Sequence, residues 1–103
     1  MDLGLKEKSV VITGGGSNIG RALVLGFAAE GARITIGDID ETQAGKVAEL
    51  ARAAGAADVQ VVRTDVTQLD QAKALMDAAV SRYGAIDALV NNVGWDQLMF
   101  FMQ

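Results

Sequence analysis

The chain has 103 residues with no Cys and no His, half of them are hydrophobic, and the formal net charge is −4. This length allows at most one small domain, and the missing residue types exclude disulfides, Cys/His zinc sites and histidine general bases. The acidic balance argues against a nucleic-acid or anionic-membrane partner, and no stretch is long enough to span a bilayer, so we expect a soluble, cytoplasmic protein.

Short apolar runs rich in β-branched residues alternate with segments whose hydrophobic residues recur at helical spacing. The predicted strands cover residues 9–13, 33–39, 59–66 and 85–94, and the predicted helices cover residues 18–30, 40–55 and 67–84. The predicted packing sides of the helices are Ile19, Leu23, Phe27 and Ala28; Ala44, Val47, Ala48 and Ala51; and Leu69, Ala72, Met76, Ala79 and Tyr83. Thr67 and Asp70 fit a capping box at the start of the third helix.

This order, βαβαβαβ, predicts an α/β fold with a doubly wound parallel sheet and helices on both faces. Ligands of such sheets bind at the carboxyl ends of the strands. The unusual residues of the chain follow those ends, namely Gly14 to Gly20, Asp38, Asp65, and Asn91 to Gly94. The sequence therefore predicts a binding site at this edge of the sheet.

The loop after the first strand lies within VVITGGGSNIGRAL, residues 11–24, and two common phosphate-binding patterns fit it poorly. The triphosphate pattern GxxxxGK[ST] would place Ala22 where Ser or Thr must ligate magnesium. The dinucleotide pattern GxGxxG meets Ile19 where its third glycine belongs. A third pattern, TGxxxGxG, fits Thr13, Gly14 and Gly20 and leaves Asn18 in the place of the middle glycine.

Three further motifs follow the later strands. Asp38 stands eighteen positions after Gly20 (38 − 20), close to the spacing of about 20 for a ribose-binding acid. TDV at 64–66 and NNVG at 91–94 follow the third and fourth strands. With TGxxxGxG, they make the chain resemble the short-chain dehydrogenase/reductase family, because TDV is similar to its adenine-contacting Asp-Val and NNVG to its NNAG signature.

The resemblance implies a Rossmann-like domain, a nicotinamide dinucleotide as cofactor, a secondary alcohol or ketone as small-molecule substrate, and a homo-oligomer for the full-length protein. In that family a Tyr in a YxxxK motif acts as general acid/base. The only Tyr here is Tyr83, and Asp87 stands four residues later. No residue of this chain is therefore assigned a catalytic role, and no metal ligand is expected.

The predicted contacts of the glycine turn and of Asp38 have physical reasons, and the remaining contacts are what the resemblance implies. Gly14 permits a positive φ, Gly20 lets the first helix pack close to the strand, and N–H groups from Ser17 to Gly20 face the pyrophosphate. Asn18 is tolerated because Asn visits the left-handed region. Asp38 accepts hydrogen bonds from the ribose hydroxyls of the adenosine and repels a 2′-phosphate, which favours NAD over NADP. The predicted cofactor-binding residues are Gly14, Ser17, Asn18, Ile19, Gly20, Asp38, Ile39, Asp65, Val66, Asn92, Val93 and Gly94.

Plainer interpretations remain open for several of these residues. Asp38 and Asp65 could each cap the helix that follows, and Asn91 and Asn92 could chiefly cross-link neighbouring strand ends. Trp95 could belong to the core or line a substrate pocket.

The tail, WDQLMFFMQ, is strongly apolar. We expect the fourth strand to form an edge of the sheet with residues 98–102 exposed. We also expect residues 1–103 to be the N-terminal part of a longer enzyme whose catalytic half is absent from this chain. The alternative is a non-catalytic nucleotide-binding or interaction module.

Overall fold

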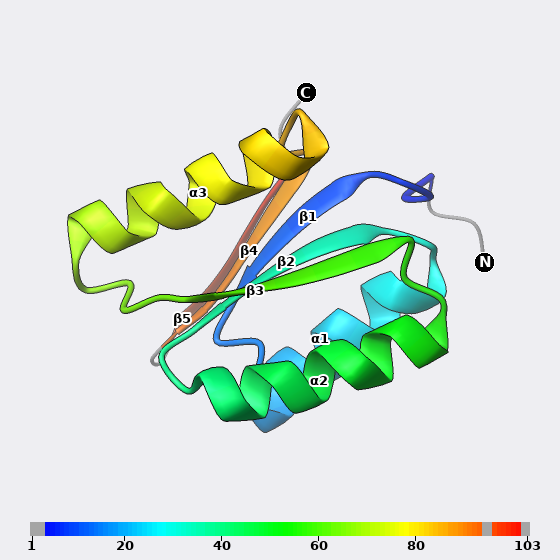
Figure 1. Ribbon diagram of the computed structural model, residues 1–103, viewed down its shortest axis with the longest axis horizontal. Helices are drawn as coiled ribbons and strands as arrows, with labels where there is room; N and C mark the ends of the chain where they lie inside the picture. The colour runs from blue at the N-terminus through cyan, green and yellow to red at the C-terminus, as the bar shows by residue number, and fades with distance from the viewer. Residues whose placement is uncertain (1–3, 94–95, 102–103) are drawn as a thin grey trace.

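The computed structural model describes residues 4–93 and 96–101, and it confirms the predicted α/β fold. The strands are β1 (Ser9–Thr13), β2 (Arg33–Asp38), β3 (Asp58–Arg63), β4 (Ala88–Val93) and β5 (Asp96–Phe101); the helices are α1 (Asn18–Ala29), α2 (Glu41–Ala54) and α3 (Leu69–Tyr83) (Figure 1). The sheet has the order β3-β2-β1-β4-β5, and the first four of these strands in space are parallel.

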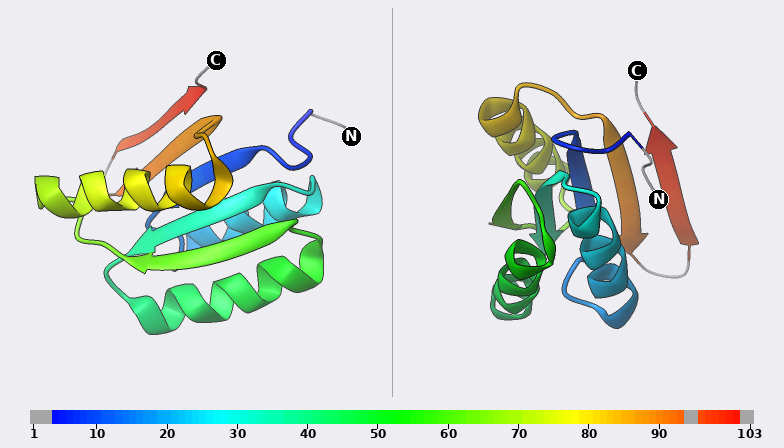
Figure 2. Two further views of the ribbon diagram at one scale, coloured as in Figure 1. Left: turned by 45° about the horizontal axis from the view of Figure 1, so that its top comes forward. Right: turned by 90° about the vertical axis from the view of Figure 1, so that its right-hand side faces the viewer.

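Helices cover both faces of the sheet, with α1 and α2 on one face and α3 on the other (Figures 1 and 2). All five residues of β1 are buried, as expected for a central parallel strand. Its side chains alternate between the two layers, so that Val10 and Ile12 join the core beneath α1 and α2, while Val11 packs with Leu75 and Ala79 of α3. Because β1, β2 and β3 run parallel, their carboxyl ends lie at one edge of the sheet.

The predicted packing face is confirmed for α2 and wrong in part for the other two helices. In α2, the four predicted residues are buried. In α1 the buried residues are Gly20, Val24 and Ala28, and the predicted Leu23 and Phe27 are partly buried against the core. The prediction is wrong at Ile19, which is 55% exposed at the start of the helix. In α3 the buried residues are Leu75 and Ala79, and Met76 packs beside them, but Leu69, the first helical residue, is 86% exposed.

The prediction that β4 forms the sheet edge is wrong, because β5 pairs with it in antiparallel fashion (Figure 2). The ladder runs from Ala88 opposite Phe101 to Val93 opposite Asp96. An edge strand offers unpaired N–H and C=O groups that a following extended segment can pair with. The expected exposure of the side chains of residues 98–102 lies outside the described residues. Among the residues described, no helix is both long and apolar enough to cross a membrane.

Candidate functional site

A pocket of about 280 Å³ opens at the carboxyl edge of the sheet. It is lined by Gly14, Ser17, Gly37, Asp38, Ile39, Thr64, Asp65, Val66, Thr67 and Asn92. These residues come from the ends of β2 and β4 and from the segments that follow β1, β2 and β3, so the structure brings the predicted motifs together. Small-molecule sites span about 300–1,000 Å³, so this volume suits part of a dinucleotide.

The glycine turn after β1 depends on two close backbone approaches. Gly14 has φ +67°, as predicted, and a Cβ at this position would lie 2.2 Å from the Asn92 carbonyl oxygen. A Cβ at Gly20 would lie 1.9 Å from the Gly14 carbonyl oxygen. The prediction of a close approach at Gly20 is right, but its neighbour is the turn at Gly14 and Gly15 and not the strand. Neither position accepts a side chain without displacement of backbone.

Ser17, which belongs to this turn, is the N-cap of α1. Its Oγ accepts the Gly20 N–H at 3.0 Å and donates to the Gly14 carbonyl at 2.9 Å. Asn18 and Ile19 are the first two helical residues, so their N–H groups have no acceptor within the helix. The positive end of the helix dipole adds to these donors, which makes the turn chemically suited to an anion.

The reason predicted for the tolerance of Asn18 is wrong. Among the described residues, Glu7 is the one non-glycine residue with a positive φ. Asn18 is tolerated because it occupies the first helical position, where its side chain is exposed. Asn18, Ile19 and Gly20 are predicted cofactor residues that do not line the pocket itself.

Asp38 ties the end of β2 to the glycine turn. Its Oδ2 accepts the Gly16 N–H at 2.8 Å, and its Oδ1 accepts the Asp40 N–H at 2.9 Å. The N-cap of α2 is Asp40, whose Oδ1 accepts the Gln43 N–H at 3.0 Å. The helix-capping interpretation of Asp38 is therefore wrong. Its carboxylate stands at the pocket wall with two backbone donors and lone pairs to spare.

Asp65 organises the turn between β3 and α3. Its Oδ1 accepts both the Thr67 hydroxyl (2.6 Å) and the Thr67 N–H (3.0 Å). These two hydrogen bonds, with the charge of Arg63, outweigh desolvation and hold the pKa of Asp65 below its ordinary value. The N-cap of α3 is Gln68, which makes no side-chain capping bond. The capping role for Asp65 and the Thr67–Asp70 capping box are therefore both wrong.

The asparagines at the end of β4 join that strand to β1 and to the glycine turn. Thr13 Oγ1 donates to Asn91 Oδ1 at 2.7 Å and accepts the Asn92 N–H at 3.0 Å. Asn92 Nδ2 donates to the Gly14 carbonyl at 3.3 Å and to Ser17 Oγ at 3.0 Å. The cross-linking interpretation is thus confirmed, and Asn92 also lines the pocket.

The structure does not describe three of the predicted positions in full, and it adds three lining residues that were not predicted. Val93 ends β4, but its side chain lies outside the described part of the chain, as do Gly94 and Trp95 entirely. Sequence reasoning missed Gly37, Thr64 and Thr67 as lining residues. The available signal was their position next to Asp38 and Asp65.

Comparisons with known proteins identify the family. A profile of the short chain dehydrogenase family matches residues 8–103. An uncharacterized oxidoreductase of Mycobacterium bovis is 44% identical over 91 residues, which are 87% of this chain and 36% of that protein. This chain therefore belongs to the short-chain dehydrogenase family of oxidoreductases.

Solved structures of family members share the fold. A hydroxysteroid dehydrogenase from Escherichia coli matches 88% of this chain and 38% of its own, with a TM-score of 0.83 and 35% identity. A short-chain dehydrogenase/reductase from Burkholderia phymatum in complex with NAD matches 82% of this chain and 30% of its own, with a TM-score of 0.77 and 40% identity. The chain spans about a third of the length of the curated relatives it matches.

Proposed function

We propose that this chain binds NAD in the pocket at the carboxyl edge and supplies the cofactor-binding part of an oxidoreductase. The reaction would transfer a hydride between the nicotinamide and a secondary alcohol or ketone. One observation carries the proposal: the Gly16 N–H donates a hydrogen bond to the Asp38 carboxylate. This bond joins the glycine turn, which suits an anion, to the acid. A dinucleotide needs both features side by side, one for its pyrophosphate and one for its ribose.

The residues fit a dinucleotide on their own geometry. Of the predicted N–H donors to the pyrophosphate, those of Asn18 and Ile19 have no acceptor within the helix. The prediction is wrong for the other two, because the Ser17 N–H pairs with the Gly14 carbonyl and the Gly20 N–H with Ser17 Oγ. In this proposal the turn from Gly14 to Gly20 holds the pyrophosphate, with Ser17, Asn18 and Ile19 in it. Asp38 and Ile39 hold the adenosine ribose, Asp65 and Val66 lie at the adenine, and Asn92, Val93 and Gly94 lie toward the nicotinamide.

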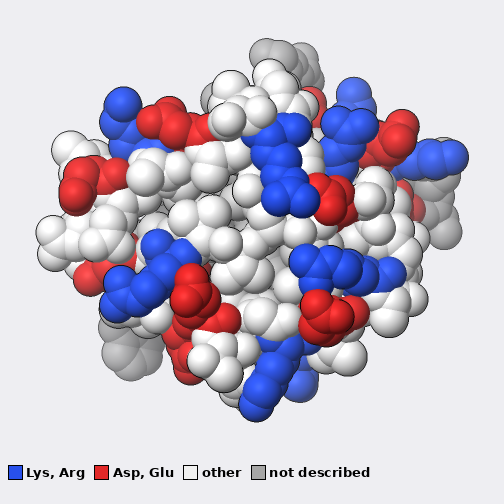
Figure 3. All heavy atoms as spheres, viewed as in Figure 1, with Lys and Arg blue, Asp and Glu red and all other residues white. Residues whose placement is uncertain are grey.

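Charge favours NAD over NADP at this site. The described lining residues include two carboxylates, Asp38 and Asp65, and no Lys or Arg. A 2′-phosphate beside Asp38 would place like charges at close range. Arg63 lies opposite Asp38 in the β2–β3 ladder but does not line the pocket. On the face shown in Figure 3, Lys and Arg are interspersed with Asp and Glu, which suits a small-molecule ligand better than a nucleic acid.

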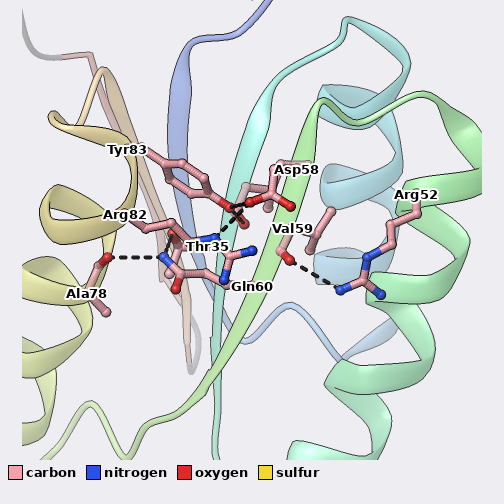
Figure 4. Close-up of polar contacts among 9 residues, drawn as sticks. Thr35, Arg52, Asp58, Val59, Gln60, Ala78, Arg82 and Tyr83 are labelled. Carbon is pink, nitrogen blue, oxygen red and sulfur yellow. Dashed lines mark hydrogen bonds and ion pairs between the residues drawn. The ribbon is translucent and has the colours of Figure 1, made fainter.

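The nicotinamide supplies the hydride chemistry when bound, and a protein acid/base must move the proton. Tyr83, the one tyrosine, lies away from the pocket: its hydroxyl lies 3.1 Å from Asp58 Oδ2 and 3.4 Å from the Ile34 carbonyl (Figure 4). We therefore propose that the proton-transferring residues belong to the part of the relatives' length that this chain does not span. Homo-oligomeric assembly and a cytoplasmic location stay predictions.

Isothermal titration calorimetry of the 103-residue chain with NADH, with NADPH, and with ATP in the presence and absence of magnesium tests this function. We expect saturable NADH binding, NADPH binding at least about tenfold weaker because of Asp38, and ATP binding that magnesium does not strengthen, because Ala22 stands where a triphosphate loop needs a magnesium-ligating Ser or Thr. We expect no substrate-dependent change in NADH absorbance with this chain alone. Absence of NADH binding, or tighter binding of NADPH, would contradict the proposal.

A further inference from the structure

One wall of the pocket is a short turn that belongs to neither neighbouring element. Thr64, Asp65, Val66 and Thr67 all line the pocket, between the end of β3 and the start of α3. The Thr64 N–H still pairs with the Asp38 carbonyl at 3.0 Å, and beyond it the sheet ladder stops. The position of the remaining wall therefore depends on contacts other than strand pairing.

The Asp65 side chain and carbonyl make local bonds. The Asp65 carboxylate accepts two hydrogen bonds from Thr67, and the Asp65 carbonyl accepts the Gln68 N–H at 3.0 Å. Two side-chain contacts reach further. The Thr64 hydroxyl donates to the Val62 carbonyl of β3 at 2.9 Å, which fixes the start of the turn on the sheet. The Asp65 N–H donates to Gln71 Oε1 at 2.8 Å, which ties the rest of the turn to α3.

Gln71 can hold the turn in place because it belongs to α3, which is itself packed on the sheet. It lies within the first turn of α3 and is half-buried. Further along the helix, Leu75 and Ala79 are buried against the sheet, and the Ala78 carbonyl accepts a hydrogen bond from Gln60 Nε2 at 3.1 Å (Figure 4). Because the Asp65 N–H requires an acceptor, the amide oxygen of Gln71 must face it, which sets the amide orientation.

We propose that Gln71 is a positioning residue for the adenosine end of the dinucleotide. By holding the Asp65 N–H, it fixes the Asp65–Thr67 wall relative to α3 and the sheet, and so raises adenosine affinity without touching the ligand. A preformed wall lowers the ordering cost of binding. The inference rests on the proposed function, and it adds a residue that lies outside the pocket lining.

The test compares three variants of the 103-residue chain by calorimetry with ADP-ribose and with 5′-AMP. Gln71→Met keeps the length of the side chain and removes the acceptor, and Gln71→Glu restores an acceptor oxygen. Gln68→Met is the matched control, because Gln68 is exposed and its side chain makes no capping bond. We expect Gln71→Met to weaken the binding of both ligands about tenfold, because the part-buried Asp65 N–H loses its acceptor. We expect Gln71→Glu to stay within about threefold of the unaltered chain and Gln68→Met to match it.

Two results would overturn the inference. One is unchanged binding by Gln71→Met; the other is an equal loss in Gln71→Met and Gln71→Glu, which would mark a packing role instead of an acceptor role. If Gln71→Met does not fold, amide exchange of the unaltered, ligand-free chain decides the matter, because the Asp65 N–H should be protected and an unprotected one refutes it. Failure of the unaltered chain to bind either ligand would instead refute the proposed function.

Discussion

The Gly16 N–H donates a hydrogen bond to Asp38 Oδ2 at 2.8 Å, and this bond joins two halves of the pocket that are 22 positions apart in the chain. It gives Asp38 a structural task beside its proposed ligand contact. A Cβ at Gly16 would lie 2.8 Å from the same oxygen, so the glycine and the acid depend on each other. Changes at Asp38 should therefore alter the stability of the chain as well as its cofactor preference.

Asp38→Asn separates these effects, because Asn keeps one acceptor oxygen and loses the charge. One of the two backbone donors loses its partner, which should cost about 1 kcal/mol of unfolding free energy. The ratio of the NADPH and NADH dissociation constants should fall about tenfold, since the like charge is removed. Urea denaturation and calorimetry measure the two quantities.

Asp40→Asn is the matched control, because Asn is as good an N-cap as Asp and Asp40 does not line the pocket. It should change neither stability nor cofactor preference by a measurable amount. A similar loss of discrimination in both variants would show that the preference arises from the overall acidity of this edge.

Two glycines of α1 should respond to Ala with opposite signs. At Gly20 the new Cβ would meet the Gly14 carbonyl at 1.9 Å, so the turn must shift, at a cost of about 1–3 kcal/mol or more. NADH binding should be lost with it. At Gly26 a Cβ meets nothing within 4 Å, so Gly26→Ala should stabilise the chain by about 0.5–1 kcal/mol. Thermal unfolding of both variants measures this contrast, and equal effects would contradict it.

Thr13 links β1 to the end of β4 through its hydroxyl, which is buried. Thr13→Val keeps the shape and leaves the Asn92 N–H and the Asn91 amide oxygen without this partner, at a cost of about 1–3 kcal/mol. Thr13→Ser keeps the hydroxyl and loses one methyl group, which should cost about 0.8 kcal/mol. Denaturant titration checks the order, and a Ser variant as unstable as the Val variant would place the effect in packing.

Tyr83 should make stability fall at alkaline pH. Burial, followed by the charge of Asp58 and the hydrogen bond to it, raises the pKa of Tyr83 well above its ordinary value of 10.0. A group whose pKa is raised by folding contributes stability that is complete below the unfolded pKa and is lost as the pH rises above it. The unfolding free energy should therefore decline above about pH 10.

Tyr83→Phe should remove this alkaline decline and cost about 0.5–1.5 kcal/mol at neutral pH, because the bond to Asp58 is lost. Since the chain has one tyrosine, the ultraviolet absorbance of tyrosinate reports this group alone. Ionisation of the native chain at the same pH as the denatured chain would contradict the assignment.

The fold followed from local pattern because strand alternation and helical spacing are visible in the residues themselves. Parallel strands then place their carboxyl ends together, which is why Asp38 and Asp65 could be predicted to share an edge with Gly14. The β4–β5 pairing was missed because an apolar tail has no periodicity that separates a strand from an exposed end.

The contacts that shape the pocket were less predictable. The partners of Asp38 and Asp65 are backbone groups and a Thr hydroxyl, and such bonds depend on loop dihedral angles that residue type does not determine. The sequence therefore predicted which residues gather at the edge but not which of them form hydrogen bonds with one another.

The most direct test of the central claim is a titration of the isotope-labelled 103-residue chain with NADH, followed by backbone amide NMR. The account predicts that saturable shift changes gather at the pocket edge, at Gly16, Ser17, Asp38, Asp65 and Asn92, while the C-terminal half of α2 and the opposite edge near Tyr83 stay unchanged. Changes centred on the far edge, or no changes at saturating NADH, would contradict it.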